Sequence, residues 1–117
     1  MKLRKGFTLV ELLVVVAIIG VLVMIAIPRF ANMTAGAQRA ALNSNHRLVI
    51  SAVTMYMAEN NGDTPANLAA LDDFLNPSEL DDSPNSTAVY TVSATDPGSV
   101  RSQATIAGEL VYFEWTP

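Results

Sequence analysis

The sequence predicts an α+β fold in which one long N-terminal helix, kinked near Pro28, packs on a small C-terminal antiparallel sheet. An apolar run near the N-terminus continues into a stretch with apolar residues three and four positions apart, which predicts one continuous helix. Three short stretches rich in β-branched and aromatic residues follow near the C-terminus, which predicts strands. The chain has 117 residues, about the length of one domain.

The composition excludes several kinds of chemistry. The chain has no cysteine, so disulfides, a thiolate nucleophile and cysteine-ligated metal sites are excluded. The formal net charge is −4, and the part after Arg47 holds ten acidic residues against Arg101 alone. Such an acidic surface repels phosphate groups, so no direct contact with nucleic acid is expected.

The first element is a membrane-spanning helix. All residues from Leu12 to Ile27 are apolar or glycine, and extension back to Phe7 adds only Thr8 and Glu11 as polar residues. At 1.5 Å per residue this segment is roughly 32 Å long, enough to cross a bilayer core. Basic residues crowd the N-terminal side and predict a cytoplasmic N-terminus; they are Lys2, Arg4 and Lys5.

A secretory signal peptide is the alternative for this segment. Its apolar region has about 7 to 15 residues, which is shorter than this run. The nearest Ala-x-Ala sequence, Ala35 to Ala37, lies well beyond Ile27, and Glu11 interrupts the apolar residues. These features favour a helix that is retained in the membrane.

Glu11 is the most informative residue of the run. A carboxylate in hydrocarbon is costly unless it is protonated or meets a cation. The side chains of Lys2, Arg4 and Lys5 could extend toward the membrane interface and partly compensate the Glu11 charge within the chain. The alternative is a cation supplied by another copy of the protein.

The N-terminus resembles that of type IV prepilins, over roughly residues 2 to 60. The residues that carry the resemblance are KGFTLVELL at 5–13, VVVAIIG at 14–20 and Pro28. It implies that a membrane-embedded prepilin peptidase cleaves between Gly6 and Phe7 and methylates the new amine. It also implies that Glu11 attracts the Phe7 amine of a neighbouring subunit, and it makes Glu11 and Pro28 candidate assembly residues.

The resemblance implies a four-part organisation. Residues 1–6 form a leader that is removed, 7–27 the transmembrane and assembly helix, 28–60 its amphipathic continuation, and 61–117 a short helix, an acidic loop and the sheet. The resemblance also implies that, before assembly, the chain is a single-pass protein of the inner (cytoplasmic) membrane. An inner-membrane assembly platform would then incorporate it into an extracellular, homo-oligomeric filament.

The implied function is that of a structural subunit of a type IV pilus. One alternative is a pseudopilin of a type II secretion system, which forms a periplasmic filament. A second alternative is a minor or competence pilin that binds DNA or a surface ligand, although the acidic distal charge opposes direct DNA capture.

The periodic stretch after Pro28 predicts that the helix continues to about Glu59. Arg29 and Arg47 share one helix face, which predicts a solvated face, with subunit contacts as the alternative. His46 has no second histidine or cysteine at metal-binding spacing, so we expect it on the helix surface. The predicted apolar stripe contains Phe30, Met33, Ala37, Ala41, Leu48, Val49, Ala52, Val53 and Tyr56.

Turn residues end the long helix at Asn60-Asn61-Gly62-Asp63. Thr64-Pro65 then predicts the start of a short helix that continues to Leu75. The predicted strands are Thr87 to Ala94, Val100 to Ile106 and Glu109 to Trp115, with a hairpin across Ala107-Gly108. In the last strand Val111, Phe113 and Trp115 share one face, and one face of that strand should cover the helix. Many members of the resembled family close this half with a disulfide, which this chain cannot form.

Acidic pairs around the second helix are candidate calcium ligands, because calcium takes several carboxylate oxygens. Pseudopilins of type II secretion are similar in using a calcium loop. The spacing matches no EF-hand, which favours a solvated acidic surface, and no other cofactor is expected. The candidates are Asp72, Asp73, Asp81 and Asp82. No catalytic triad, paired-acid arrangement or phosphate-binding loop is recognisable, so we do not expect an enzyme.

Overall fold

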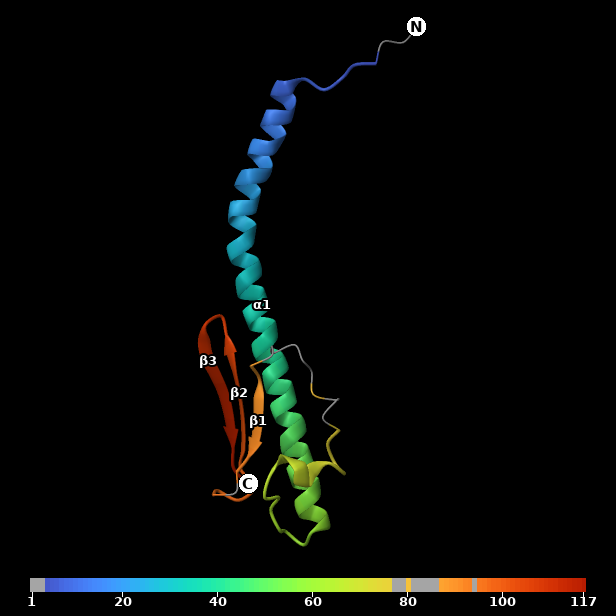
Figure 1. Ribbon diagram of the computed structural model, residues 1–117, viewed down its shortest axis with the longest axis vertical. Helices are drawn as coiled ribbons and strands as arrows, with labels where there is room; N and C mark the ends of the chain where they lie inside the picture. The colour runs from blue at the N-terminus through green and yellow to red at the C-terminus, as the bar shows by residue number, and fades with distance from the viewer. Residues whose placement is uncertain (1–3, 77–79, 81–86, 94) are drawn as a thin grey trace. The chain divides into compact units, whose positions relative to one another are not determined.

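The computed structural model describes residues 4–76, 80, 87–93 and 95–117. Its helices are α1, Leu9–Glu59, and the short 3-10 helix η1, Leu68–Leu71; its strands are β1, Val89–Val92, β2, Val100–Ile106, and β3, Glu109–Trp115 (Figure 1). These elements confirm the predicted α+β class. The chain divides into two compact units, residues 1–34 and 35–117, which we describe separately.

The helix α1 begins at Leu9 and ends at Glu59, close to the predicted bounds. Pro28 lies inside it, and the residues on both sides are helical. Proline lacks an N–H group and crowds the preceding turn, which is why we expect a bend at this point. Helix on both sides of Pro28 is confirmed, and the kink stays a prediction.

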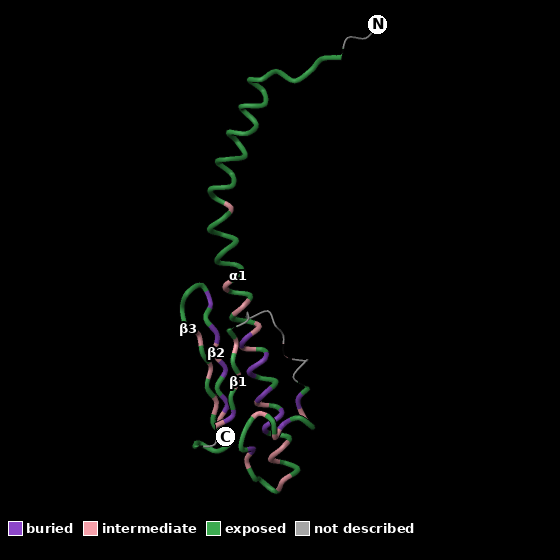
Figure 2. Tube along the Cα trace, viewed as in Figure 1, coloured by how far each residue is buried: buried purple, intermediate pink, exposed green. Residues whose placement is uncertain are grey.

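In the second unit a three-stranded antiparallel sheet packs against one face of α1. The strand order is β1-β2-β3, and the buried residues of the helix lie alongside those of the strands (Figure 2). One cluster of buried residues joins Val49 and Val53 of α1 to Val100 of β2, and a second joins Leu42 to Ala104 and Ile106. The core therefore lies between the helix and β2, the central strand.

The hairpin between β2 and β3 has the predicted bounds. Its strands pair from Val100↔Trp115 to Ile106↔Glu109. The two turn residues, Ala107 and Gly108, have φ of 53° and 80°, the combination that a two-residue turn of the favoured mirror-image type requires. The first strand is shorter than predicted at its start, since β1 covers Val89–Val92, and the predicted last residue, Ala94, lies outside the described residues.

The predicted short helix from Pro65 to Leu75 is wrong. The structure has only the four-residue η1, which begins after Asn67, and the Asn67 side chain accepts a hydrogen bond from the Ala70 N–H at 3.0 Å. Asparagine is among the best helix-capping residues, so it starts the turn in place of Thr64. Pro65 is buried instead.

The predicted apolar stripe on α1 is partly wrong. Its members Val49, Ala52 and Val53 are buried as expected, whereas Phe30 and Met33 are 68% and 70% exposed. The helix face that contacts the sheet also contains Leu42, Asn45 and His46, which the stripe omitted. Leu48, which belongs to the predicted stripe, is 39% exposed.

His46 is buried, contrary to the prediction of a position on the helix surface. Two polar pairs connect this part of the helix to the sheet. The His46 Nδ1 lies 2.9 Å from the Ser102 Oγ, and the His46 ring contacts that of Phe113. Beside it the Asn45 Nδ2 donates to the Tyr90 Oη at 2.7 Å. Burial lowers the pKa of His46, since the charged imidazolium loses its hydration.

Candidate processing and assembly segment

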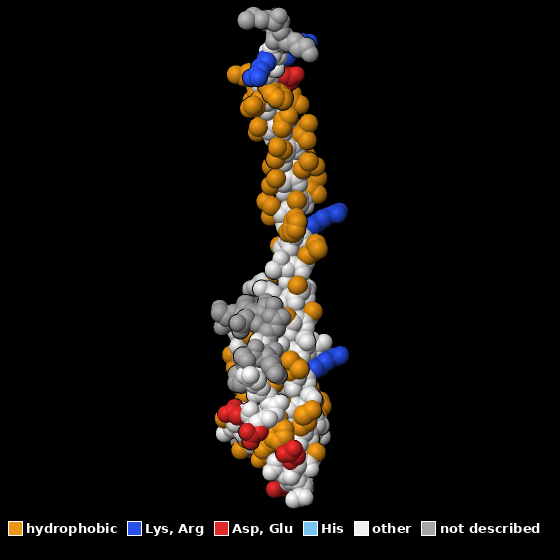
Figure 3. All heavy atoms as spheres, turned by 90° about the vertical axis from the view of Figure 1, so that its right-hand side faces the viewer, with side chains coloured by type: hydrophobic (Ala, Val, Ile, Leu, Met, Phe, Trp, Pro, Cys, Tyr) orange, Lys and Arg blue, Asp and Glu red, His pale blue; other side chains and the backbone are white. Residues whose placement is uncertain are grey.

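The first half of α1 presents an apolar surface on every side. Hydrophobic side chains cover the face of this half that Figure 3 shows, and none of its most apolar stretch is buried within the chain. Among the described residues, α1 is the one helix long and apolar enough to cross a membrane. A helix that is hydrophobic all round requires lipid or other protein around it.

Glu11 takes part in a reciprocal cap at the start of this helix. The Thr8 N–H and the Thr8 hydroxyl both donate to the Glu11 Oε2, at 2.8 and 3.1 Å. In return, the Glu11 N–H donates to the Thr8 Oγ1 at 3.2 Å. This is the capping-box arrangement, in which two backbone N–H groups that the helix cannot satisfy find side-chain partners.

The cap leaves one carboxylate oxygen open to the outside. Within the described part of the chain, the Glu11 Oε1 accepts no hydrogen bond, and neither Arg4 nor Lys5 forms an ion pair with Glu11. Lys2 lies outside the described residues. The structure therefore does not place a described leader cation on Glu11, and the carboxylate can still receive a donor from another molecule.

Gly6 and Phe7 lie in an exposed stretch ahead of the helix. Residues 4–8 have no regular secondary structure, and the Phe7 side chain is 89% exposed. A Cβ added at Gly6 would have no heavy atom within 4 Å, and the backbone there does not adopt the left-handed region. The fold of the chain therefore does not require glycine at position 6.

Sequence reasoning missed the role of Thr8. The signal that could have found it is the T-x-x-E pattern of residues 8–11, because a threonine followed three positions later by glutamate is the signature of a capping box.

The candidate calcium ligands are only partly described. Asp72 and Asp73 are exposed beside η1, whereas Asp81 and Asp82 lie outside the described residues. Within the described part of the chain, no three histidine or acidic residues are close enough to hold a metal ion. Calcium binding stays an untested alternative to the solvated acidic surface that the spacing favours.

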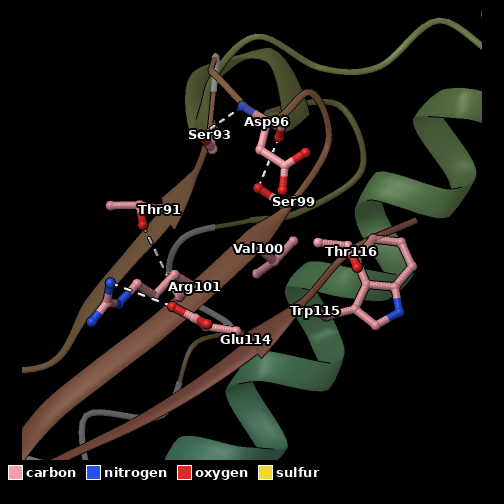
Figure 4. Close-up of a pocket in the computed structure, with 9 residues that line it drawn as sticks. All are labelled: Thr91, Ser93, Asp96, Ser99, Val100, Arg101, Glu114, Trp115 and Thr116. Atoms are coloured by element: carbon pink, nitrogen blue, oxygen red, sulfur yellow. Dashed lines mark hydrogen bonds and ion pairs between the residues drawn. The ribbon is translucent and has the colours of Figure 1, made fainter.

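A polar hollow of about 290 Å³ lies at one end of the sheet (Figure 4). The Arg101 guanidinium and the Glu114 carboxylate line it and pair with each other at 3.4 Å. The Ser93 Oγ accepts a hydrogen bond from the Asp96 N–H, and the Ser99 hydroxyl donates to the Asp96 carbonyl. Most of these polar groups satisfy one another and hold the turn between β1 and β2 in shape.

The two arginines predicted to share a helix face, Arg29 and Arg47, are both exposed. A third, Arg39, pairs with Glu109 of β3 at 3.6 Å. The exposure agrees with the predicted solvated face, and a role in subunit contacts stays the untested alternative.

Residues 1–27 match the family model of the prokaryotic N-terminal methylation motif. With the relatives described next, this match confirms the predicted resemblance of the N-terminal segment to type IV prepilins.

The chain is 43% identical over 58 residues to the type IV narrow pilus major component PilA5 of Thermus thermophilus, which is 50% of each chain. It is 60% identical over 38 residues to a fimbrial protein of Pseudomonas aeruginosa, and over 37 residues to the type IV major fimbrial protein FimA of Dichelobacter nodosus. Those two matches cover 32% of this chain and 25% and 24% of the relatives. The chain thus spans half the length of the first relative and a quarter of the others. No solved structure matches the chain significantly.

Proposed function

We propose that the chain is a structural subunit of a type IV pilus, cleaved between Gly6 and Phe7 and assembled through its first helix half. The observation that carries this proposal is the exposed apolar surface of residues 9–27, with one capped carboxylate near its start. The relatives named above are pilus proteins, which favours the pilus over a secretion pseudopilus.

The proposed cleavage changes the charges around Glu11. It removes Lys2, Arg4 and Lys5 and creates one amine at Phe7, so the mature side chains carry a net charge of −7. A carboxylate and an amine in a low-dielectric surrounding attract strongly, and either group is costly there without a partner. Pairing between Glu11 and the Phe7 amine of a neighbour would therefore fix the register between subunits.

The same apolar surface serves both stages of the proposed life of the subunit. Before assembly the lipid chains of the cytoplasmic membrane surround it, and afterwards the helices of other subunits do. Helices associate in lipid mainly through packing and polar contacts rather than through the hydrophobic effect, so a small number of charges can decide the assembled arrangement. The partners of this proposal are prepilin peptidase, the inner-membrane assembly platform and other copies of the chain.

The processing step is tested with Gly6→Ala. The uncut leader should remain, because the fold leaves space for a methyl group at this position and only the peptidase can therefore discriminate against it. Gly20→Ala is the matched control, since a Cβ there also meets nothing within 4 Å. The mass of the membrane-bound protein reports cleavage, and normal cleavage of Gly6→Ala would refute the proposed site.

A further inference from the structure

The outer edge of β3 carries backbone groups that no described element satisfies. The two-residue turn after β2 makes Ile106 and Glu109 the closing pair of the hairpin, and such a pair exchanges both backbone hydrogen bonds. Alternation along the strand then directs the N–H and C=O groups of Leu110, Tyr112 and Glu114 away from β2. In Figure 1, β3 forms the outer edge of the sheet with no described element beside it.

This edge lacks the features that usually protect an edge strand. Proteins block such edges with lysine, proline, bulges or very short strands. The seven residues of β3 contain neither lysine nor proline, and their pairing with β2 is uninterrupted. Its two glutamates are each bound to an arginine of the same chain, Glu109 at 3.6 Å and Glu114 at 3.4 Å, so the edge has little free charge. The other edge strand, β1, has only four residues.

Side chains next to this edge are also incompletely covered. Leu110 and Tyr112 are 54% and 53% exposed on the outer face. On the inner face Phe113 and Trp115 are only half-buried, whereas Ser102 of the adjacent β2 is fully buried. A further strand beside β3 would cover both sets.

We propose that β3 is an interface for a second copy of this chain, which pairs edge to edge and antiparallel with Tyr112 opposite Tyr112. This register places Leu110 opposite Glu114 in both directions, so all three outward pairs can form hydrogen bonds. It also keeps the glutamates away from each other, whereas a register centred on Glu114 would place like charges directly opposite.

The symmetry of this contact determines where it forms. An edge-to-edge antiparallel pair has two-fold symmetry, and such a contact closes on itself instead of repeating along a polar fibre. Given the proposed function, on which this inference rests, the second copy belongs to a neighbouring filament. One contact is weak, but many contacts along two filaments act together, so lateral association becomes stable.

Disulfide trapping tests the register, and the absence of native cysteine makes the readout specific. In Tyr112→Cys filaments, mild oxidation should convert most subunits into covalent dimers. The control is Gln103→Cys, which pairs with Tyr112 from the adjacent strand. Two such residues would lie about three strand spacings apart, roughly 14 Å, too far for a disulfide. Equal dimer yields from the two variants would overturn the proposal.

Charge variants test the association itself, measured as the filament fraction that sediments at low speed as bundles. Tyr112→Lys places two ammonium groups opposite each other and should abolish bundling. Leu110→Lys places its ammonium opposite Glu114 of the second copy and should preserve or increase it. Bundling that is unchanged in Tyr112→Lys overturns the interface while leaving the filament intact. Failure of the unmodified chain to form filaments would instead refute the proposed function, and this inference with it.

Discussion

Glu11→Gln separates the two roles that the structure gives to this side chain. Glutamine keeps an oxygen that can accept from Thr8, so the cap, with its bonds of 2.8 and 3.1 Å, should survive. The charge is lost, and the Phe7 amine of the neighbouring subunit then has no counter-ion in an apolar surrounding. Removal of one partner from such a pair should weaken subunit association roughly 10²- to 10⁴-fold.

The reciprocal variant is Thr8→Ala, which removes the hydroxyl and keeps the Glu11 charge. Loss of an N-cap side chain costs about 1 kcal/mol, so association should weaken by less than about tenfold. Both variants should still insert and be cleaved, as mass measurement of the membrane fraction can verify. The assay is the filament yield after high-speed sedimentation, with electron microscopy of the pellet. Normal filaments from Glu11→Gln, together with few from Thr8→Ala, would show that the cap and not the charge directs assembly.

Three further predictions concern the second unit and are measured by unfolding of the full chain in detergent. Burial lowers the pKa of His46 below 6.5, so its contribution to the free energy of unfolding is present above pH 6.5 and is lost as the pH falls through the folded-state pKa. His46→Gln should remove this pH dependence. The same dependence of stability on pH in His46→Gln and in the unmodified chain would contradict the prediction. Gly98→Ala should lower the free energy of unfolding by about 1–3 kcal/mol, since φ is +80° and an added Cβ would lie 2.9 Å from a side-chain carbon of Thr64. Gly108→Ala has the same φ but open space around the added Cβ, so it should cost about 1 kcal/mol. Equal losses of stability in the two variants would exclude the steric contribution at Gly98. Leu42→Ala should lower the free energy of unfolding by about 2–5 kcal/mol and Leu48→Ala by much less, because Leu42 is fully buried and Leu48 is 39% exposed. Similar losses of stability in the two variants would contradict the helix face assigned to the core.

The elements that the sequence predicted correctly are those set by local patterns. The bounds of β2 and β3 follow from alternation on both sides of Ala107-Gly108, and both turn residues adopt positive φ as the short connection demands. The extent of α1 follows from its apolar run and from the turn residues after Glu59. No contact with a distant residue is needed to read either feature.

The errors arose where tertiary contacts override the pattern. An apolar stripe cannot contain Asn45 or His46, yet both are buried because Tyr90 and Ser102 satisfy them from the sheet. Leu48 is apolar, but it lies outside the helix face that packs on the sheet. The position of β3 at the edge of the sheet could not be predicted either, because alternation along a sequence identifies a strand without giving its place in the sheet.

The candidate site was predicted from its motif rather than from periodicity. Gly6, Phe7 and Glu11 were named from the resemblance, and the structure adds that the fold itself makes no demand for glycine at position 6. The partner of Glu11 within the chain, Thr8, could have been read from the sequence alone. What no single sequence contains is the neighbouring subunit, so the other half of the proposed pair can be established only in the filament.

The geometry of the cap bears on how a membrane-embedded subunit could begin to assemble. Both hydrogen bonds from Thr8 reach the same oxygen of Glu11, Oε2, so the carboxylate is held in one orientation before any neighbour arrives. In the proposed filament the Phe7 amine of that neighbour would approach the open Oε1, and the cap would not have to break. The helix start therefore need not unfold during assembly, and a preformed orientation reduces the entropy lost on pairing. The cap and the intersubunit pair should accordingly act together, which a double variant of Thr8 and Glu11 would reveal as a loss smaller than the combined single losses.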